Sequence, residues 1–308
     1  MLELSATSIN DFLSCRKMYE YRKIRGIYPA EKPRALGFGS AVHKGLEHFF
    51  KQIQLGIEPS KEDAMSAVEV ACEGNEMCPE DAIKATCLVD KYIDRYSEND
   101  CKWFEVLSVE YAFEAFLDNP ETGKESKSFK LHGFIDGLVR DKNDGRLYIL
   151  EHKTSGMVND GYLDRILIDW QIAIYAHCIS KIMKEPVVGA IYDIIKKPAI
   201  RMSAGTAKKP PETADEFRAR CMDNITDDNF IRHTIIFEDS IMAGFLADIW
   251  SVANDMKGCK NYYKCTCNCL KYGTCPYMAL CRANGDIEQV KEQYIVGNGE
   301  ADTDGDAE

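Results

Sequence analysis

Three ionisable residues stand close together in the segment LHGFIDGLVRDKNDGRLYILEHKTSG (residues 131–156): Asp136, Glu151 and Lys153. The residues around them are mostly apolar and β-forming, so the segment is typical of two strands in the core of a sheet. A carboxylate is costly to bury unless a cation compensates its charge. Two carboxylates that share a divalent cation, with a lysine beside them, would explain why all three charges occupy strand positions.

The Asp-Gly pair at 144–145 is a strong signal for a two-residue hairpin turn between these strands. With that turn, Asp136 is expected directly opposite Lys153, and Glu151 directly opposite Leu138. Side chains alternate along a strand, so these four residues are predicted to share one face. Asp136 and Glu151 would be diagonal neighbours, about 7–8 Å apart at the backbone, and could converge on one cation. A simpler interpretation is a structural ion pair between Asp136 and Lys153, with Glu151 solvated.

The chain has 13 cysteines, an odd number that fits poorly with a complete set of disulfides. Five of them are concentrated in CTCNCLKYGTCPYMALC (265–281), and Cys15 stands alone near the N-terminus. In a reducing compartment such clustering favours a metal site over disulfides. Four thiolates suit zinc as well as an iron–sulfur cluster, and free thiols are the third possibility. The other seven are expected to be buried small hydrophobic residues: Cys72, Cys78, Cys87, Cys101, Cys178, Cys221 and Cys259.

The periodicity of apolar residues predicts the elements that must position these groups. Helices are expected at 5–24, at 34–53, twice within 60–97 with a break at Pro79, at 168–183, and near 212–224 and 239–256. Strands are expected at 103–117, 130–141, 147–154, 187–197 and 232–238, and a loop at 198–211. The order is helices, then β-β-β-α-β, then a helical and cysteine-rich end. This order predicts an α/β fold with a mixed central sheet.

The net charge of −12 argues against a protein that coats nucleic acid through its overall charge. The charge is unevenly distributed, however. Residues 1–51 carry nine Lys/Arg against five Asp/Glu, whereas the last nine residues hold five acids and no base. A local basic surface near the N-terminus therefore leaves nucleic-acid binding open. No run of eighteen apolar residues and no signal-like N-terminus is present, so a cytoplasmic location without membrane contact is expected.

Several of these motifs resemble those of one family. GFIDGLV…ILEHKTSG resembles the core signature of the PD-(D/E)XK nuclease superfamily, an Asp on one strand and Glu-x-Lys on the next. GFGSAVHKGLEHFF resembles the histidine motif of its RecB-like branch through His43, and DWQIAIYAHCI resembles that branch's Gln-x-x-x-Tyr helix through Gln171 and Tyr175. Cys15 with CLKYGTCPYMALC resembles the iron–sulfur arrangement of AddB-type and CRISPR-associated or phage exonucleases. The resemblance covers about residues 5–285, with five motifs in the expected order.

The resemblance implies a restriction-endonuclease-like core with a mixed central sheet and an αβββαβ order. To this core it adds an N-terminal helical insertion and a C-terminal cysteine-rich iron–sulfur segment. The implied divisions are 1–30, an N-terminal helix with the first cluster cysteine; 31–100, a helical region with the His motif; 101–258, the nuclease core; 259–285, the cluster segment; and 286–308, an acidic disordered tail.

The resemblance also implies a function, a metal-dependent DNA nuclease. It would be an exonuclease on single-stranded DNA or DNA ends, acting in recombination, repair, phage replication or CRISPR adaptation. His43, Asp136, Glu151 and the main-chain carbonyl of His152 would bind Mg²⁺ or Mn²⁺. Lys153 would stand beside the attacking water and favour hydroxide.

The remaining implied roles concern positioning and the cluster. Gln171 and Tyr175 lie four residues apart, on one helix face, where they would hold the nucleic-acid backbone or orient Lys153. Glu110 is expected at a sheet edge or as a supporting residue. A [4Fe–4S] cluster would be bound by Cys15, Cys269, Cys275 and Cys281, with Cys265 and Cys267 as competing ligands and zinc as the alternative metal.

Two other classes of protein fit part of the pattern. One is a non-catalytic iron–sulfur DNA-binding subunit of a recombination or defence complex, and the other is a zinc-ribbon interaction protein. The three adjacent ionisable residues of the hairpin argue against the first, because a site without chemistry has no physical reason to keep them. Metal analysis would distinguish the second. DNA is the expected partner, with a helicase or recombination protein as a possible second one.

Overall fold

The computed structural model describes residues 1–31, 33–207, 209–271 and 273–297. The described chain divides into two compact units, neither of which is continuous in sequence. Unit 1 consists of described residues within 1–33, 114–133 and 238–297, and unit 2 consists of described residues within 34–113 and 134–237. Strands β3 (Phe104–Asp118) and β4 (Glu125–Asp141) contribute residues to both units.

Unit 2 is built on a mixed sheet, as the sequence predicts. Its strands follow the order β4, β5 (Leu147–Ser155), β6 (Val187–Lys196) and β7 (Phe230–Ile236), and β3 pairs with β4. The β5–β6 pair is parallel, whereas β4–β5 and β6–β7 are antiparallel. The mixed sheet and its helices are consistent with a restriction-endonuclease-like fold.

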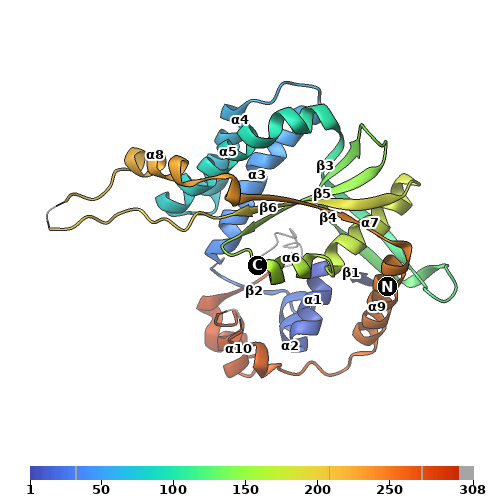
Figure 1. Ribbon diagram of the computed structural model, residues 1–308. Coiled ribbons are helices and arrows are strands. Elements are labelled where there is room, and N and C mark those ends of the chain that lie inside the picture. Colours follow the sequence, from blue (N-terminus) through green and yellow to red (C-terminus); the bar gives the residue numbers. More distant parts are fainter. Residues whose placement is uncertain (32, 208, 272, 298–308) are drawn as a thin grey trace. The chain divides into compact units, whose positions relative to one another are not determined.

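Helices cover both faces of this sheet (Figure 1). Helix α3 (Arg34–Gln54) packs on β5 and on α4 (Lys61–Gly74) and α5 (Pro79–Trp103). Helix α7 (Trp170–Met183), preceded by the short α6 (Asp160–Ile166), packs against β5 and β6. Helix α8 (Ala214–Asn224) packs on α5 and is followed by a 3₁₀ turn, η2 (Asp227–Asn229).

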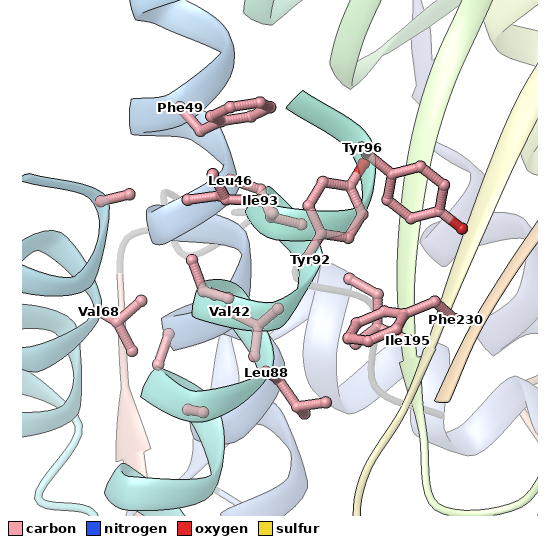
Figure 2. Packing of buried hydrophobic residues seen from close by; sticks show 14 of the residues in the cluster. Val42, Leu46, Phe49, Val68, Leu88, Tyr92, Ile93, Tyr96, Ile195 and Phe230 are labelled. Atoms are coloured by element: carbon pink, nitrogen blue, oxygen red, sulfur yellow. The ribbon is translucent and has the colours of Figure 1, made fainter. Parts of the chain in front are cut away.

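An extensive apolar core lies between α3, α5 and the sheet (Figure 2). Val42, Leu46 and Phe49 of α3 face Leu88 and Ile93 of α5, and all five side chains are buried. Helices α3 and α4 approach very closely at Gly45, where a Cβ atom would lie 2.5 Å from Val68 Cγ2. Glycine at this position fixes the depth at which α3 sits on its neighbours.

The segment Asp160–Met183 is long and apolar enough to cross a membrane by length and composition alone. It consists of two helices, α6 and α7, and half of its most apolar stretch is buried inside the structure. In α7 the residues from Gln171 to Ala176 are all buried. The segment therefore has the burial of a core helix.

Unit 1 brings together both ends of the described chain. Its N-terminal elements are β1 (Leu2–Leu4), α1 (Ala6–Ser14), α2 (Arg16–Tyr19), a π-helix η1 (Glu20–Ile24) and β2 (Ile27–Pro29). Its C-terminal elements are α9 (Asp239–Gly258), η3 (Thr266–Asn268), α10 (Met278–Arg282), η4 (Ile287–Gln293) and β8 (Tyr294–Val296). Strand β1 pairs in parallel with β4 at Phe129–Leu131, and β2 pairs with β8 in antiparallel.

Two sequence predictions for unit 1 differ from the structure. The single helix predicted at 5–24 starts as expected with a capping box between Ser5 and Ser8, but it breaks at Cys15, which is extended. The acidic tail predicted from 286 is ordered at its start, since residues 287–296 form η4 and β8 and Tyr294 packs into a small apolar core. Residues 298–308 of that predicted tail lie outside the described residues.

Candidate active site

The candidate site forms where β4 and β5 separate. The backbone pairing of these strands ends at Gly137↔Leu150, one residue before Asp136 on β4 and Glu151 on β5. The backbone N–H of His152 donates to Asp136 Oδ2 at 2.7 Å. The carboxylate of Asp136 thus accepts a hydrogen bond that a backbone carbonyl of the neighbouring strand would normally accept, and the side chain lies in the gap between the two strands.

The register differs from the predicted one by two residues. Residues 142–145 form a four-residue loop, closed by the hydrogen bond from Asp141 N–H to Arg146 O. The same register places Asp136 across from Glu151 rather than across from Lys153. The predicted turn at 144–145 is wrong because two side chains stabilise the longer loop: Asp141 Oδ1 accepts from Asn143 N–H, and Asp144 Oδ1 accepts from Arg146 N–H.

Asp136 belongs to a group of three potential metal ligands. One donor atom each from His43, Glu110 and Asp136 lies within 4.8 Å of the others. His43 Nδ1 is 3.3 Å from Asp136 Oδ1. Helix α3 can bring His43 this close because Gly39, one turn earlier, would place a Cβ atom only 3.1 Å from Thr154 Oγ1 of β5. A larger residue at 39 would hold the helix away from the strand.

Glu110 occupies a strained backbone position. Its φ of 49° lies in the left-handed region, which a non-glycine residue adopts at an energetic cost and which is common at functional sites. Burial, together with the neighbouring carboxylate of Asp136, raises the pKa of the Glu110 carboxyl to about 7. In contrast, burial opposes ionisation of Asp136, but His43 and His152 hold the pKa of its carboxyl well below the usual range. Strongly shifted pKa values of neighbouring carboxyls are typical of functional sites.

The second part of the site lies on the face of β5 that contacts α7. Lys153 Nζ is 3.2 Å from Glu151 Oε1 and donates to Gln171 Oε1 at 3.1 Å. Gln171 Nε2 donates to Glu151 Oε1 at 3.2 Å and to Tyr175 Oη at 2.6 Å. All four side chains are buried. Gln171 therefore holds the glutamate and the lysine in fixed positions.

His152 connects the site to a buried ionic network. Its Nδ1 lies 3.3 Å from Asp136 Oδ2, and its Nε2 lies 3.4 Å from Tyr92 Oη. Tyr92 Oη donates to Asp193 Oδ2 at 2.6 Å. Arg232 pairs with Asp193 (Nε to Oδ1, 2.6 Å) and with Asp100 (Nη1 to Oδ1, 2.5 Å). This network fixes the ring of His152 behind Asp136.

The structure brings the predicted residues together in two adjoining sets rather than one. His43 and Asp136 lie in the candidate ligand group, whereas Glu151 lies outside that group and contacts Lys153 and Gln171. Glu110 was predicted to be a sheet-edge or supporting residue, but the structure places it in the candidate ligand group. An acidic residue inside the apolar strand pattern VLSVEYAF was the only signal for it.

The predicted cysteine ligands meet in unit 1. Cys15, Cys269, Cys275 and Cys281 line one cavity of about 360 Å³, and Cys265 lines it too. The N–H of Cys265 donates to Cys15 Sγ at 3.3 Å. All 13 cysteines are described residues, and none of them forms a disulfide. Cys15 therefore lies beside the C-terminal cysteines, although 250 residues separate it from Cys265.

Comparison with known proteins agrees with this geometry. The family model of the PD-(D/E)XK nuclease superfamily matches residues 3–282. No curated protein matches the chain with significance. Among solved structures, the crystal structure of SSO0001 aligns with 14% sequence identity and a TM-score of 0.32. The alignment covers 78% of this chain and 84% of that chain. The family match extends over nearly the whole chain and includes every residue of the candidate site, so the protein belongs to the PD-(D/E)XK nuclease superfamily.

Proposed function

We propose that this protein is a metal-dependent deoxyribonuclease that acts as an exonuclease on single-stranded DNA or DNA ends. Members of its superfamily are typically nucleases that use Mg²⁺ or Mn²⁺, and DNA is their substrate class. The observation that carries the proposal is the pair of adjoining sets around Asp136 and Glu151. One set offers cation ligands, and the other offers a buried lysine held in place.

The ligand set fits a hard divalent cation. Carboxylate oxygens with one imidazole nitrogen suit Mg²⁺ and Mn²⁺ better than soft metals. An octahedral cation with bonds of about 2.0–2.1 Å places its ligand atoms roughly 3–4 Å apart, so a small contraction of the 4.8 Å group would suffice. His43, Glu110 and Asp136 would hold the cation, and Glu151 stands beside them. When bound, the cation would supply Lewis-acid chemistry at the scissile phosphate.

The protein's own residues contribute positioning and charge. Lys153 carries a compact ammonium group, which can stabilise the negative charge that develops on the phosphate oxygens. Its contacts with Glu151 and Gln171 fix the ammonium in one place. Tyr175 in turn supports Gln171, so both residues of the Gln-x-x-x-Tyr motif act as positioning residues.

Cleavage of 5′-labelled single strands tests the catalytic proposal. Wild-type protein with Mn²⁺ or Mg²⁺ should shorten a labelled 30-mer, and a chelator should stop the reaction. Asp136→Asn and Glu151→Gln should each reduce the rate by at least 10³-fold while the melting temperature stays high enough for assay. A circular single strand should resist, because an exonuclease needs an end. Undiminished cleavage by both variants would refute the assignment.

We also propose that Cys15, Cys269, Cys275 and Cys281 bind a [4Fe–4S] cluster. The convergence of these four residues on one cavity supports the proposal. Zinc would draw its four thiolates together, since Zn–S bonds of about 2.3 Å place the sulfurs roughly 3.8 Å apart. Among the described residues, no trio of cysteine sulfurs lies within 4.8 Å of one another. A single zinc ion would therefore require the cysteine side chains to move closer together.

Metal analysis of protein purified without oxygen tests the cluster. About four irons per chain and absorbance near 400 nm are expected. Cys265 and Cys267, whose sulfurs lie 3.1 Å apart, are the matched competitors. Cys265→Ser should keep its iron if the four proposed ligands are correct. If the analysis finds one zinc per chain and no iron, the site binds zinc and the cluster proposal is wrong. The setting we propose for the enzyme is the cytoplasm, alongside a helicase or recombination partner.

A further inference from the structure

A second cavity of unit 1, of about 850 Å³, is lined by a group of lysine and tyrosine side chains. We infer that this cavity is a binding site for single-stranded nucleic acid, with phosphates held by lysines and bases held against tyrosines. The inference takes the class of polymer from the proposed nuclease function. The location, charge and shape of the site come from unit 1 alone.

The cavity concentrates positive charge in an acidic protein. Lys23 of η1, Lys127 of β4 and Lys257 at the end of α9 line it, and Glu3 is the only carboxylate in the lining. The whole chain has a net charge of −12. The exposed side chains of Lys127 and Lys257 thus bring ammonium groups from two elements far apart in sequence to one site, whereas the Nζ atom of Lys23 is buried in the wall. Lys257 Nζ donates to Ser128 Oγ at 2.9 Å, which directs this lysine toward the cavity wall formed by β4.

Tyrosine rings complete the lining. Tyr28 and Tyr262 are half-buried, so each ring presents part of its surface to the cavity. Tyr19 is buried beneath Tyr262, with ring centres 6.2 Å apart and planes inclined by 31°. That support keeps Tyr262 in a fixed orientation at little entropic cost. Basic groups beside rigid aromatic rings are the combination that sequence-tolerant single-strand binding uses.

The geometry favours a single strand over a duplex. In a duplex the bases already stack on each other and their faces are closed to protein side chains. A ring at a cavity wall gains contact only with an unstacked base. A cavity of about 850 Å³ also lies in the range that encloses a small-molecule-sized ligand, which corresponds to a short stretch of one strand.

The same two chain segments shape this cavity and the cysteine cavity. Tyr19 follows Cys15 by one turn of helix, and Tyr262 precedes Cys265 by three residues. The N–H of Lys17 donates to Tyr263 O at 3.1 Å, which joins the two segments between the cavities. Ligation of a cluster by Cys15 would therefore hold the wall that presents Tyr262.

Fluorescence anisotropy with a 5′-fluorescein 12-nucleotide single strand, in EDTA and without cleavage, tests the site. The double variant Lys127→Gln/Lys257→Gln should bind about 25-fold more weakly at 0.1 M salt, because each phosphate contact contributes roughly fivefold there. The slope of log K against log salt should fall by about 1.4, or 0.7 per lysine. Tyr262→Leu should cost about 5- to 150-fold in affinity with an unchanged salt slope. Lys291→Gln, an exposed lysine of unit 1 outside the cavity, is the matched control and should bind as wild type.

Circular dichroism and melting curves should show that the variants fold. Unchanged affinity and salt slope in the double variant would overturn the inference, as would equal affinity for a 12-base-pair duplex or no binding by wild type. DNA and RNA strands of one sequence should both bind, since neither phosphates nor stacking distinguish them. If wild type binds through the cavity yet cleaves nothing with Mg²⁺ or Mn²⁺, the proposed function fails and the binding site stands. If wild type cleaves normally and the cavity variants bind normally, the proposed function stands and the binding site is wrong.

Discussion

Replacing Glu110 with glutamine should stabilise the metal-free protein at alkaline pH. In the folded chain, the Glu110 carboxyl lies in a partly buried group with Asp136 and His43, and its φ is strained. Ionising this group without a cation is unfavourable, which is why its pKa is raised. Glutamine keeps the size and shape of the side chain but carries no charge, so the variant removes the electrostatic cost alone.

The magnitude follows from the pKa. A rise from 4.5 to about 7 corresponds to roughly 3 kcal/mol, at about 1.4 kcal/mol per tenfold change in the acid constant. Because Glu110 is only partly buried, solvent screening reduces this to about 1–3 kcal/mol. The sign is fixed by linkage. The folded carboxyl binds a proton more tightly than the unfolded one, so stability is greatest below pH 4.5, falls as pH rises through 7, and then levels off.

Urea denaturation in EDTA at pH 5.5, 7 and 8.5 measures this difference. Glu110→Gln should gain stability over wild type as pH rises, by about 1–3 kcal/mol at pH 8.5. Added Mg²⁺ or Mn²⁺ should raise the stability of wild type much more than that of the variant, because the variant lacks one ligand. Parallel pH profiles for the two proteins would refute the reasoning, since they would mean that Glu110 ionises in the folded state as freely as in water.

Three further predictions concern folding and metal content. Arg232→Met should cost about 3–5 kcal/mol, because it leaves the carboxylates of Asp193 and Asp100 buried and uncompensated. The partly exposed pair of Arg140 with Glu185 is the control, and Arg140→Met should cost much less stability than Arg232→Met in the same urea denaturation assay. Cys15→Ser should yield a colourless protein with a lower melting temperature. Its free energy of unfolding should fall by several kcal/mol, since the proposed cluster closes a very long loop. If the variant keeps its iron and its melting temperature, Cys15 is not a ligand. Gly45→Ala should cost about 1–3 kcal/mol by overpacking against Val68, and an unchanged melting temperature would show that α4 moves away freely.

The sequence predicted the main helices and strands of unit 2 because their hydrophobic periods are clear. Helices α3, α5 and α7 and strands β4 to β6 lie within a few residues of their predicted positions. Tertiary context decided the rest. The Asp-Gly signal suggested a two-residue turn, yet the hydrogen bonds that the carboxylates of Asp141 and Asp144 accept favoured a longer loop. Strands β1, β2 and β8 have only three residues each, too short for any period to appear.

The candidate site shows the same division. Gln171 and Tyr175 could be placed together because helical spacing alone puts them on one face, and the structure joins them by a hydrogen bond. The position of Glu110 could not be predicted, because it depends on a left-handed backbone conformation that no local pattern predicts for glutamate. Likewise, Glu151 faces Lys153 rather than the ligand group because the strands separate directly beside it.

The convergence of both ends of the described chain in unit 1 has a consequence during synthesis. Unit 2 has all of its residues once position 237 leaves the ribosome, but unit 1 lacks its third segment until about 60 more residues follow. At 5–20 residues per second, that interval is about 3–12 s. Cys15 waits still longer for the cysteines that share its cavity, since 250 residues separate it from Cys265. If Cys15 binds the cluster that we propose, its thiol lacks that metal throughout translation, and oxidation should damage nascent chains more readily than finished ones.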